Sequence, residues 1–577
     1  MLCITTASFS VQVNGELAGY FQSSRGLRQG CSLSSYLFFM SMDVLSKMLD
    51  QAADLRKFGH HPRCKTTGLT HLSFADDIMI FTDGKVRSID GIVEVFEYFA
   101  KRSGLKISME KSTIYLAGVS PSICQEIDTR YQFNVCHLPV RYLGLPLVTK
   151  RLTSSDYIPL LEQIKRRIGS WTARFLSYAG RLNLSQSILW SICTFWISAY
   201  RLPRECIREI DKVCSAILWS GPDLNSRKAK LSWTAVCKPK EEGGLGLRSL
   251  KEANEVCCLK LIWKLVSHGN SLWVSWIKQN LLKQDNFWSI KENTSLGSWM
   301  WKKLLKYRAV AKHFVKAEVN NGLRVSFWYE NWSNAGCLMD VVGERGTIDL
   351  AIRKNMTLAD AWTDRRPRRH RNTVLNQIEE ELMSKRQSQK SSNDVVLWRG
   401  KNNIYRTHFS TKDTWDHIRL KAEEVSWHKG IWFAQATPKL SFCSWVAVQD
   451  RLATCDRLIK WNRGAQAHCV FCTVRVETRD HLFLPIRSRD LETSSKEHIQ
   501  SQVLHTLDRY NHFDQWHMAE QRNRLPCSLC FPTDITHYLA GTQWEKTWRD
   551  SNFSTSSITL DREATQKQDL LCSYEWR

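Results

Sequence analysis

Two adjacent carboxylates, Asp76 and Asp77, are the residues of this sequence whose type and spacing most directly suggest chemistry. They separate two apolar, strand-like runs within residues 68–82, GLTHLSFADDIMIFT. Carboxylate oxygens are the ligands that a hard divalent cation such as Mg²⁺ prefers. Because most Asp-Asp pairs are solvated turn residues, the pair alone is a weak indication of a metal site, and its neighbouring motifs must decide.

A second set of candidate metal ligands lies near residue 470, where Cys469-x-x-Cys472 is followed by His481. Two thiolates two residues apart can share one tetrahedral zinc ion, and an imidazole nitrogen can add a third ligand. A structural zinc site normally has four protein ligands, for which His468 and Cys455 are nearby candidates. Buried, reduced cysteines are the alternative interpretation of the same pattern.

The composition identifies the classes of partner. The chain of 577 residues has 81 Lys and Arg against 57 Asp and Glu, so its net charge of +24 predicts a polyanionic partner. No run approaches the length of a membrane span, and the N-terminus lacks the basic start of a secretion signal. The 19 cysteines are irregularly spaced, which favours reduced thiols. We therefore expect an intracellular protein without a membrane partner.

The elements that must position the two carboxylates follow from local patterns. Strand-like residues 9–13 and 16–22 flank Asn14-Gly15, a strong hairpin signal. Apolar residues recur at three- and four-residue spacing over 33–49 and again over 89–102, which predicts two amphipathic helices. Strands interspersed with helices predict an α+β fold for this part of the chain.

The rest of the chain divides by composition. Residues 151–260 show a helical period of about 3.6, and residues 260–335 are rich in Trp, for which core packing is the default interpretation. The basic run 365–371, RRPRRHR, fits a solvated loop as well as a phosphate-binding or nuclear-import patch. Residues 384–393, SKRQSQKSSN, read as a polar linker.

Four motifs in a fixed order favour a metal site over a solvated turn for the carboxylate pair. They are GLRQGCSLSSYLF at 26–38, FADD at 74–77, SGLKISMEKS at 103–112 and RYLGLPL at 141–147. Together they resemble the reverse transcriptases of non-LTR (LINE-type) retrotransposons, especially those of plants. The resemblance continues through a thumb-like region to about residue 485, where the Cys/His unit is similar to the zinc-binding domain that follows these enzymes.

The resemblance implies RNA-directed DNA polymerase (nucleotidyltransferase) activity, in which a primer 3′-hydroxyl attacks the α-phosphorus of a deoxynucleotide, with RNA and DNA as the template-primer partners. It implies two Mg²⁺ ions held by Asp76 and Asp77, and a zinc ion held by Cys469, Cys472 and His481. The other implied site residues are Arg28, Gln29 and Gly30 for template and nucleotide positioning, Lys111 near the pyrophosphate, and Tyr142, Leu143 and Gly144 in the primer grip.

The sequence also departs from the family. The family's first catalytic aspartate lies upstream of GLRQG, whereas the only acidic residue before Arg25 is Glu16, which follows the predicted turn and does not look like a replacement. Ile486 stands where the family has its fourth zinc ligand, so we expect an incomplete zinc site. The family's fingers and amino-terminal endonuclease have no counterpart. We therefore expect a 5′-truncated, pseudogene-like copy with impaired polymerase activity; the alternative is a non-catalytic nucleic-acid-binding remnant or adapted retroelement protein.

The resulting prediction is an α+β protein with a partial right-hand polymerase palm, without fingers or first palm strand, followed by four further regions. The expected regions are a partial palm at 1–150, a helical thumb-like region at 151–260, a Trp-rich connecting region with a basic linker at 261–393, a small zinc-binding-like domain at 394–490 and a divergent tail at 491–577. Nuclear residence follows from where such elements act.

Overall fold

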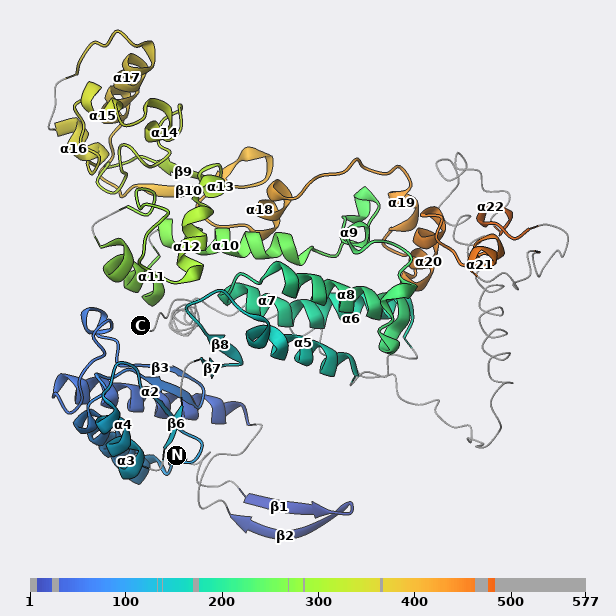
Figure 1. Cartoon of the computed structure of the whole chain (residues 1–577), viewed down its shortest axis with the longest axis horizontal. Coiled ribbons are helices and arrows are strands. Elements are labelled where there is room, and N and C mark those ends of the chain that lie inside the picture. Colours follow the sequence, from blue (N-terminus) through green and yellow to red (C-terminus); the bar gives the residue numbers. More distant parts are fainter. Residues whose placement is uncertain are drawn as a thin grey trace. The chain divides into compact units, whose positions relative to one another are not determined.

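The structure is a computed structural model, shown in Figure 1. It describes residues 8–22, 31–131, 133–136, 139–169, 176–267, 269–283, 286–363, 367–461, 468 and 476–482. The described chain forms two compact units, each built from two separate stretches: 8–151 with 258–409, and 152–257 with 410–482. Both helices and strands are present, which confirms the mixed α+β character. Among the described helices, none is long and apolar enough to cross a membrane.

The first element is the expected hairpin. Strand β1 (Ser8–Val13) pairs antiparallel with β2 (Glu16–Gln22). Its turn residues both have positive φ, 51° at Asn14 and 92° at Gly15. Asn and Gly tolerate this left-handed backbone better than other residues, so the local sequence alone selects the turn.

Two helices and a second hairpin surround the carboxylate pair. Helices α2 (Ser32–Asp54) and α3 (Val86–Ser103) extend slightly beyond the predicted ranges, and α3 ends before Gly104, whose φ is 75°. Strands β3 (His71–Phe74) and β4 (Asp77–Ile80) pair antiparallel. The two helices and the strand β4 share one hydrophobic cluster, formed by residues that include Leu45, Leu49, Phe58, Val95, Phe99, Ile78 and Ile80.

Short strands complete this part of the unit. Strand β5 (Thr113–Tyr115) runs parallel to β6 (Asn134–Cys136), and helix α4 (Pro121–Arg130) connects them. Strand β7 (Val140–Tyr142) then pairs antiparallel with β8 (Leu145–Leu147). These pairings and β3–β4 are separate two-stranded sheets within the described residues.

The stretch after residue 151 is helical, as its periodicity predicts. Its helices are α5 (Ser154–Gly169), α6 (Tyr178–Leu184), α7 (Trp190–Ala199), α8 (Arg204–Ser220), the short α9 (Trp233–Val236) and α10 (Leu250–Val266). One turn of π-helix, Ser185–Leu189, joins α6 to α7. Helix α8 packs against both α5 and α6.

The chain after residue 410 packs onto these helices. Its helices are α18 (Thr411–Ile418), α19 (His428–Ile431), α20 (Pro438–Val448), α21 (Cys455–Trp461) and α22 (Arg479–Leu482). Phe442 and Trp445 of α20 share a core with Leu218 and Trp219 of α8. Trp445 stacks on Trp219 with ring centroids 6.4 Å apart, so α20 and α8 pack directly against each other.

The glycine-rich segment 241–246, EEGGLG, forms hydrogen bonds and an ion pair with the chain after residue 410. The Trp445 indole donates a hydrogen bond to the Gly243 carbonyl at 2.8 Å, and Arg419 binds the buried carboxylate of Glu242 at 2.5 Å. A Cβ on Gly244 would lie 2.0 Å from the Lys238 carbonyl oxygen, so only glycine fits there. Segment 241–246 therefore packs against the chain after residue 410, which local sequence signals do not reveal.

The Trp-rich region forms its own core, and the default interpretation of its Trp residues is confirmed for Trp328, Trp332 and Trp362, all buried. Its elements are α11 (Leu272–Ile277), α12 (Trp299–Lys306), α13 (Arg308–Lys312), β9 (Val315–Glu318), α14 (Leu338–Val342), α15 (Gly346–Asp349), α16 (Leu358–Thr363), α17 (Thr373–Gln387), β10 (Val395–Arg399) and β11 (Tyr405–Arg406).

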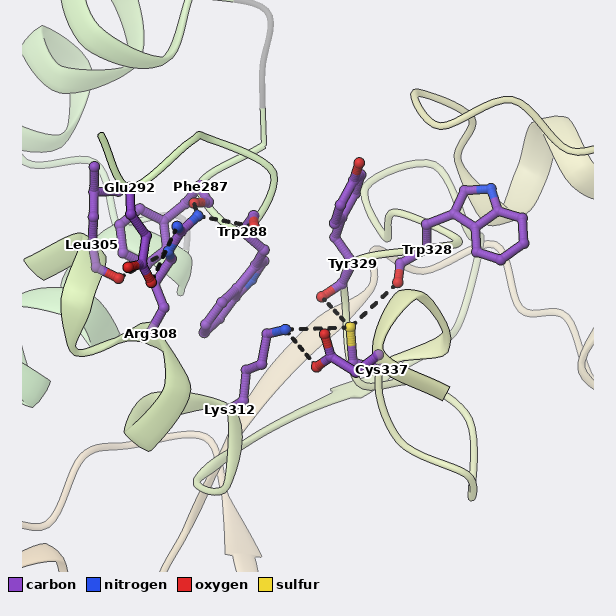
Figure 2. A network of polar contacts seen from close by, with 10 residues as sticks. Phe287, Trp288, Glu292, Leu305, Arg308, Lys312, Trp328, Tyr329 and Cys337 are labelled. Atoms are coloured by element: carbon purple, nitrogen blue, oxygen red, sulfur yellow. Dashed lines mark hydrogen bonds and ion pairs between the residues drawn. The ribbon is translucent and has the colours of Figure 1, made fainter. Parts of the chain in front are cut away.

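Buried polar side chains pin the loops of this region (Figure 2). The Arg308 guanidinium donates to the carbonyls of Phe287, at 3.1 Å, and Trp288, at 2.9 Å. Burial lowers the pKa of Arg308 despite the nearby Glu292 carboxylate. One helical turn later, Lys312 forms an ion pair with Asp340 at 2.5 Å. The Arg308 contacts satisfy backbone carbonyls that irregular loops would otherwise leave without partners.

The polar segment 384–393 differs from the expected linker. Its first four residues complete α17, and strand β10, which follows it directly, pairs antiparallel with β9. The Asp394 carboxylate accepts hydrogen bonds from the backbone amides of Asn320, Gly322 and Arg324, at 2.8, 2.9 and 3.0 Å. Low-complexity composition does not decide the structure here, because the segment begins inside α17 and is followed by Asp394, whose tertiary hydrogen bonds fix the chain.

Candidate active site

The Asp76–Asp77 pair lies at the tip of the β3–β4 hairpin. Phe74 pairs with Asp77, so Ala75 and Asp76 form a two-residue connection. Ala75 has φ 49°, a left-handed conformation that costs an alanine roughly 1 kcal/mol. Such strain persists only where surrounding structure enforces it. Both carboxylates are exposed, so the strained turn presents them to solvent on a short, rigid support.

Packing from two sides enforces this turn. Side chains alternate along a strand, so Ile78 and Ile80 of β4 face the helices α2 and α3. Met79 faces the other way and packs against Val140 and Tyr142 of β7. The strand that begins with Asp77 is therefore clamped between a helical layer and the β7–β8 hairpin.

Hydrogen bonds fix the start of β3 to α2. The Thr70 hydroxyl donates to the Asp50 carboxylate at 2.5 Å and also lies 2.7 Å from Nδ1 of His71. The other ring nitrogen of His71 lies 2.8 Å from the Ser46 hydroxyl. Both Thr70 and His71 are buried, so these bonds are shielded from water and hold the hairpin in one register.

The end of β4 is fixed to α3 through Asp83. Its Oδ1 accepts a hydrogen bond from the Ser88 hydroxyl at 2.7 Å, and Ser88 in turn accepts from the Gly59 amide at 3.0 Å. Burial raises the pKa of Asp83, but the hydrogen bonds and the charge of Lys85 outweigh it, and the net pKa is lowered. A Cβ on Gly59 would lie 2.4 Å from Asp83 Oδ2, so the loop can approach only as glycine.

Tyr142 connects the predicted primer grip with the carboxylates. The turn after β7 has positive φ at Leu143, 51°, and at Gly144, 79°, as a tight two-residue hairpin requires. Burial first, and then the negative charge of Asp77, raise the pKa of Tyr142 to about 12. The phenol is therefore neutral and lies within electrostatic range of the Asp77 carboxylate. The two motifs are more than 60 residues apart in the sequence, and the packing of Met79 against Val140 and Tyr142 brings their strands β4 and β7 together.

The remaining predicted positions do not join this pair in the described structure. Lys111 is exposed in the turn before β5, and its amine takes part in none of the ion pairs between described residues. Arg28, Gln29 and Gly30 lie outside the described residues. The assembled part of the site is therefore Asp76, Asp77 and Tyr142.

The predicted zinc ligands are only partly described. Cys469, Cys472 and Ile486 lie outside the described residues, whereas His481 lies in α22. Within the described ranges, no three Cys, His, Asp or Glu side chains gather closely enough to hold a metal ion. Of the three predicted zinc ligands, His481 is therefore the one that lies among the described residues, beside the substitute candidates His468 and Cys455.

Glu477 is a residue of this region that sequence reasoning missed. It is buried, and its carboxylate accepts hydrogen bonds from the backbone and thiol of Cys455. Burial raises its pKa, while Cys455 and the nearby His481 act in the opposite direction. Cys455, one of the substitute ligands considered above, is thus engaged by Glu477. The four-residue spacing from Glu477 to His481 was the available signal.

Comparison with known families gives two matches along this chain. Residues 2–147 match the family model described as reverse transcriptase (RNA-dependent DNA polymerase). Residues 409–486 match the family model described as zinc-binding in reverse transcriptase. The first match contains all three assembled residues, Asp76, Asp77 and Tyr142. The second covers Cys455, Glu477 and the predicted zinc ligands.

Individual relatives cover only part of this chain. A "putative ribonuclease H protein" from Arabidopsis thaliana is 29% identical over 220 residues, which are 37% of this chain and 35% of that protein. The 149 kDa protein of transposon TX1 from Xenopus laevis is 24% identical over 250 residues, 42% of this chain and 18% of its own length. A mitochondrial protein from Arabidopsis thaliana is 39% identical over 71 residues, 11% of this chain and 54% of its own. The chain thus spans about a third or less of the two longer relatives.

Proposed function

Because the chain belongs to the non-LTR retrotransposon reverse transcriptases and carries the zinc-binding domain that follows them, we propose that Asp76 and Asp77 are metal-binding carboxylates of an RNA-directed DNA polymerase. The observation that carries the proposal is the packing of Met79, in the strand that begins with Asp77, against Val140 and Tyr142 of β7. A primer held by the β7–β8 hairpin would reach the carboxylates directly. RNA and DNA are then the partners, deoxynucleotides the substrates, and the nucleus the place of action.

The donor set at the hairpin tip fits Mg²⁺. Asp76 and Asp77 offer hard oxygen ligands, they are exposed, and none of the ion pairs between described residues involves them. Mg²⁺ usually keeps several waters and takes one or two protein carboxylates, which an exposed tip allows. Bound there, Mg²⁺ would activate the attacking primer oxygen and neutralise charge on the triphosphate.

We also propose that residues 1–577, tested by themselves, extend a primer poorly. The first Asp of this sequence is Asp43 in α2, and Glu16 is the only acidic residue before it. In the part of the chain that the structure describes, Asp76 and Asp77 belong to no group of three metal-binding side chains. Two carboxylates offset less of the repulsion between two neighbouring cations than three would, so the cations are held more weakly.

Zinc binding by Cys469, Cys472 and His481 is part of the same proposal. Supporting it are the two-residue spacing of the thiols and the match of this region to the zinc-binding family model. Zinc measured in the purified chain at near-stoichiometric level, and lost in Cys469→Ser, is the expected result. A chain that folds without zinc and is indifferent to a chelator would contradict it.

Primer extension on an RNA template with Mg²⁺ tests the catalytic proposal, run beside a salt-titrated binding assay with the same template and primer. Asp76→Asn is the test variant. Asp128→Asn, which changes an exposed carboxylate on α4, is the matched control. We expect salt-dependent binding in all three proteins, and weak extension that Asp76→Asn alone abolishes.

Two other outcomes are decisive. Robust extension by the wild-type chain that Asp76→Asn removes would overturn the proposed impairment and keep the assigned site. Binding without any extension would favour the alternative function, a nucleic-acid-binding remnant or adapted protein, for which the net charge of +24 is sufficient.

A further inference from the structure

The helical stretch between residues 176 and 257 contains a cavity of about 300 Å³. It belongs to the compact unit that does not contain the carboxylate pair, and none of the functions assigned above uses it. Its wall is made by the π-helical turn Ser185–Leu189, by α7 and α8, by α9 and by the loop before α10. The lining residues that carry the argument are Trp190, Asp211, Trp233 and Arg248, together with Cys193 and Cys214.

The backbone around the cavity is unusual in two places. Ser185, Gln186 and Leu189 of the π-helical turn all face it, and such single π-turns are rare and concentrate at functional sites. Gly246, another lining residue, has φ 76° and carries no side chain.

The wall is flat and mostly apolar. Trp190 and Trp233 are half-buried and contribute indole rings, while Cys193 and Cys214 are buried. Burial raises the pKa of Cys193 to about 12 and also raises that of Cys214, so both thiols are neutral. Neutral thiols behave as small apolar groups. Two indoles beside such a surface suit a planar, aromatic ligand.

Two charged groups give the cavity its polarity. The Asp211 carboxylate accepts a hydrogen bond from the Trp233 indole and takes part in none of the ion pairs between described residues. Burial raises the pKa of Asp211 to about 6. At the mouth, Arg248 is exposed and its guanidinium lies 5.9 Å from the Trp415 ring centroid. An acceptor therefore sits inside the cavity and a cation at its entrance.

We propose that this cavity binds one unpaired nucleobase of single-stranded nucleic acid, with guanine preferred, and that Arg248 contacts the adjoining phosphate. The inference rests on the proposed nucleic-acid-binding function and adds a base-specific site to it. Unpaired bases are read in this way elsewhere, by stacking on aromatic side chains and by hydrogen bonds to the Watson–Crick edge.

Guanine fits the charge pattern better than the other bases. Its N1–H and exocyclic amino group point in the same direction, so both can donate to one carboxylate in bidentate fashion. Uracil offers a single N–H on that edge, and adenine and cytosine offer one amino group beside an acceptor nitrogen that Asp211 would repel. The Trp233 indole occupies one acceptor position of the Asp211 carboxylate. Guanine would donate to the positions that remain.

The wild-type full chain can test this without any substitution. Fluorescence anisotropy would measure binding of an oligouridine with one central guanine, and of matched oligomers with inosine, with uracil or with an abasic site at that position. We expect the abasic oligomer to bind at least about fivefold more weakly, because a stacked base is lost. Inosine, which lacks the amino group, should fall between guanine and the abasic site.

Two variants locate the effect. Asp211→Asn should remove the preference for guanine over inosine, whereas Glu209→Gln, an exposed residue on the same helix α8, should keep it. Arg248→Gln should weaken all four oligomers by a similar factor. Equal affinity of the wild-type chain for the four oligomers, with salt-dependent binding intact, would overturn this inference alone. Loss of all binding would instead overturn the proposed function on which it rests.

Discussion

The Asp76–Asp77 hairpin and the Asp211 cavity present carboxylates in opposite ways. The hairpin lifts two carboxylates into solvent on a strained turn that packing clamps from both sides. The cavity surrounds a single carboxylate with indoles and neutral thiols. An exposed pair can share a hydrated cation, whereas a buried carboxylate favours ligands whose N–H groups replace the water it has lost. The support around a carboxylate thus decides which chemistry the same functional group can perform.

The largest expected effect tests the support of the hairpin. Leu49→Ala removes a fully buried side chain from the cluster beneath β4 and should destabilise α2, α3 and the hairpin by about 2–5 kcal/mol. Hydrogen exchange of peptides from 45–100 would measure the local loss. Leu55→Ala, at a position 65% exposed, is the control and should change exchange little. Equal protection in the two variants would show that the hairpin does not depend on this core.

The next effect concerns the cost of ionising Asp211. Its pKa is raised from 3.8 to about 6 by burial, so the folded state holds the proton more tightly than the unfolded chain. Stability should therefore fall as pH rises from about 4 to 6, and Asp211→Asn should be more stable than wild type at pH 7 by about 1–3 kcal/mol.

Thermal melting across this pH range measures the difference. Below pH 4 both states carry the proton and the advantage of Asp211→Asn should vanish. The exposed Glu209→Gln variant should follow wild type at every pH. An advantage for Asp211→Asn that does not change between pH 4 and 7 would indicate a cause other than ionisation.

A smaller change in stability is expected at the exposed carboxylate pair, Asp76 and Asp77. Asp76→Asn removes an exposed charge, so the stability of the apo protein should change by less than about 0.5 kcal/mol. Stabilisation by Mg²⁺ should amount to about 1 kcal/mol for wild type at Mg²⁺ several times above Kd, and should be lost in the variant. Melting curves with and without Mg²⁺ measure both quantities. If Asp128→Asn loses the Mg²⁺ effect equally, the hairpin is not the binding site.

The smallest expected effect concerns the electrostatic interaction between Asp77 and Tyr142. Burial is the main reason that the pKa of Tyr142 reaches about 12, and the Asp77 charge is the second. Asp77→Asn should therefore lower this pKa by a fraction of a unit and leave it above 10. Ultraviolet titration of the variant, with Tyr142→Phe to identify the signal, measures the shift. An unchanged pKa would separate the predicted primer grip from the carboxylates.

Much of the local structure was predictable. Asn14-Gly15 specified the first hairpin, and the apolar period specified α2 and α3, because these signals depend on neighbours within a few residues. The order of four motifs was enough to identify the family, which the matches at 2–147 and 409–486 support. The loss of polymerase activity, the role of Lys111 and the zinc site remain predictions.

The sequence by itself determined which chemical groups this protein has: an adjacent carboxylate pair, a net positive charge and many Trp residues suited to core packing. Only the tertiary structure decided which groups meet. Tyr142 approaches Asp77, Trp445 binds the Gly243 carbonyl, Cys455 binds Glu477, and Asp211 lies in a cavity lined by Trp190 and Trp233. Most of these pairs join residues tens to hundreds of positions apart. Such contacts depend on how whole helices and hairpins pack, and local periodicity carries no information about that packing.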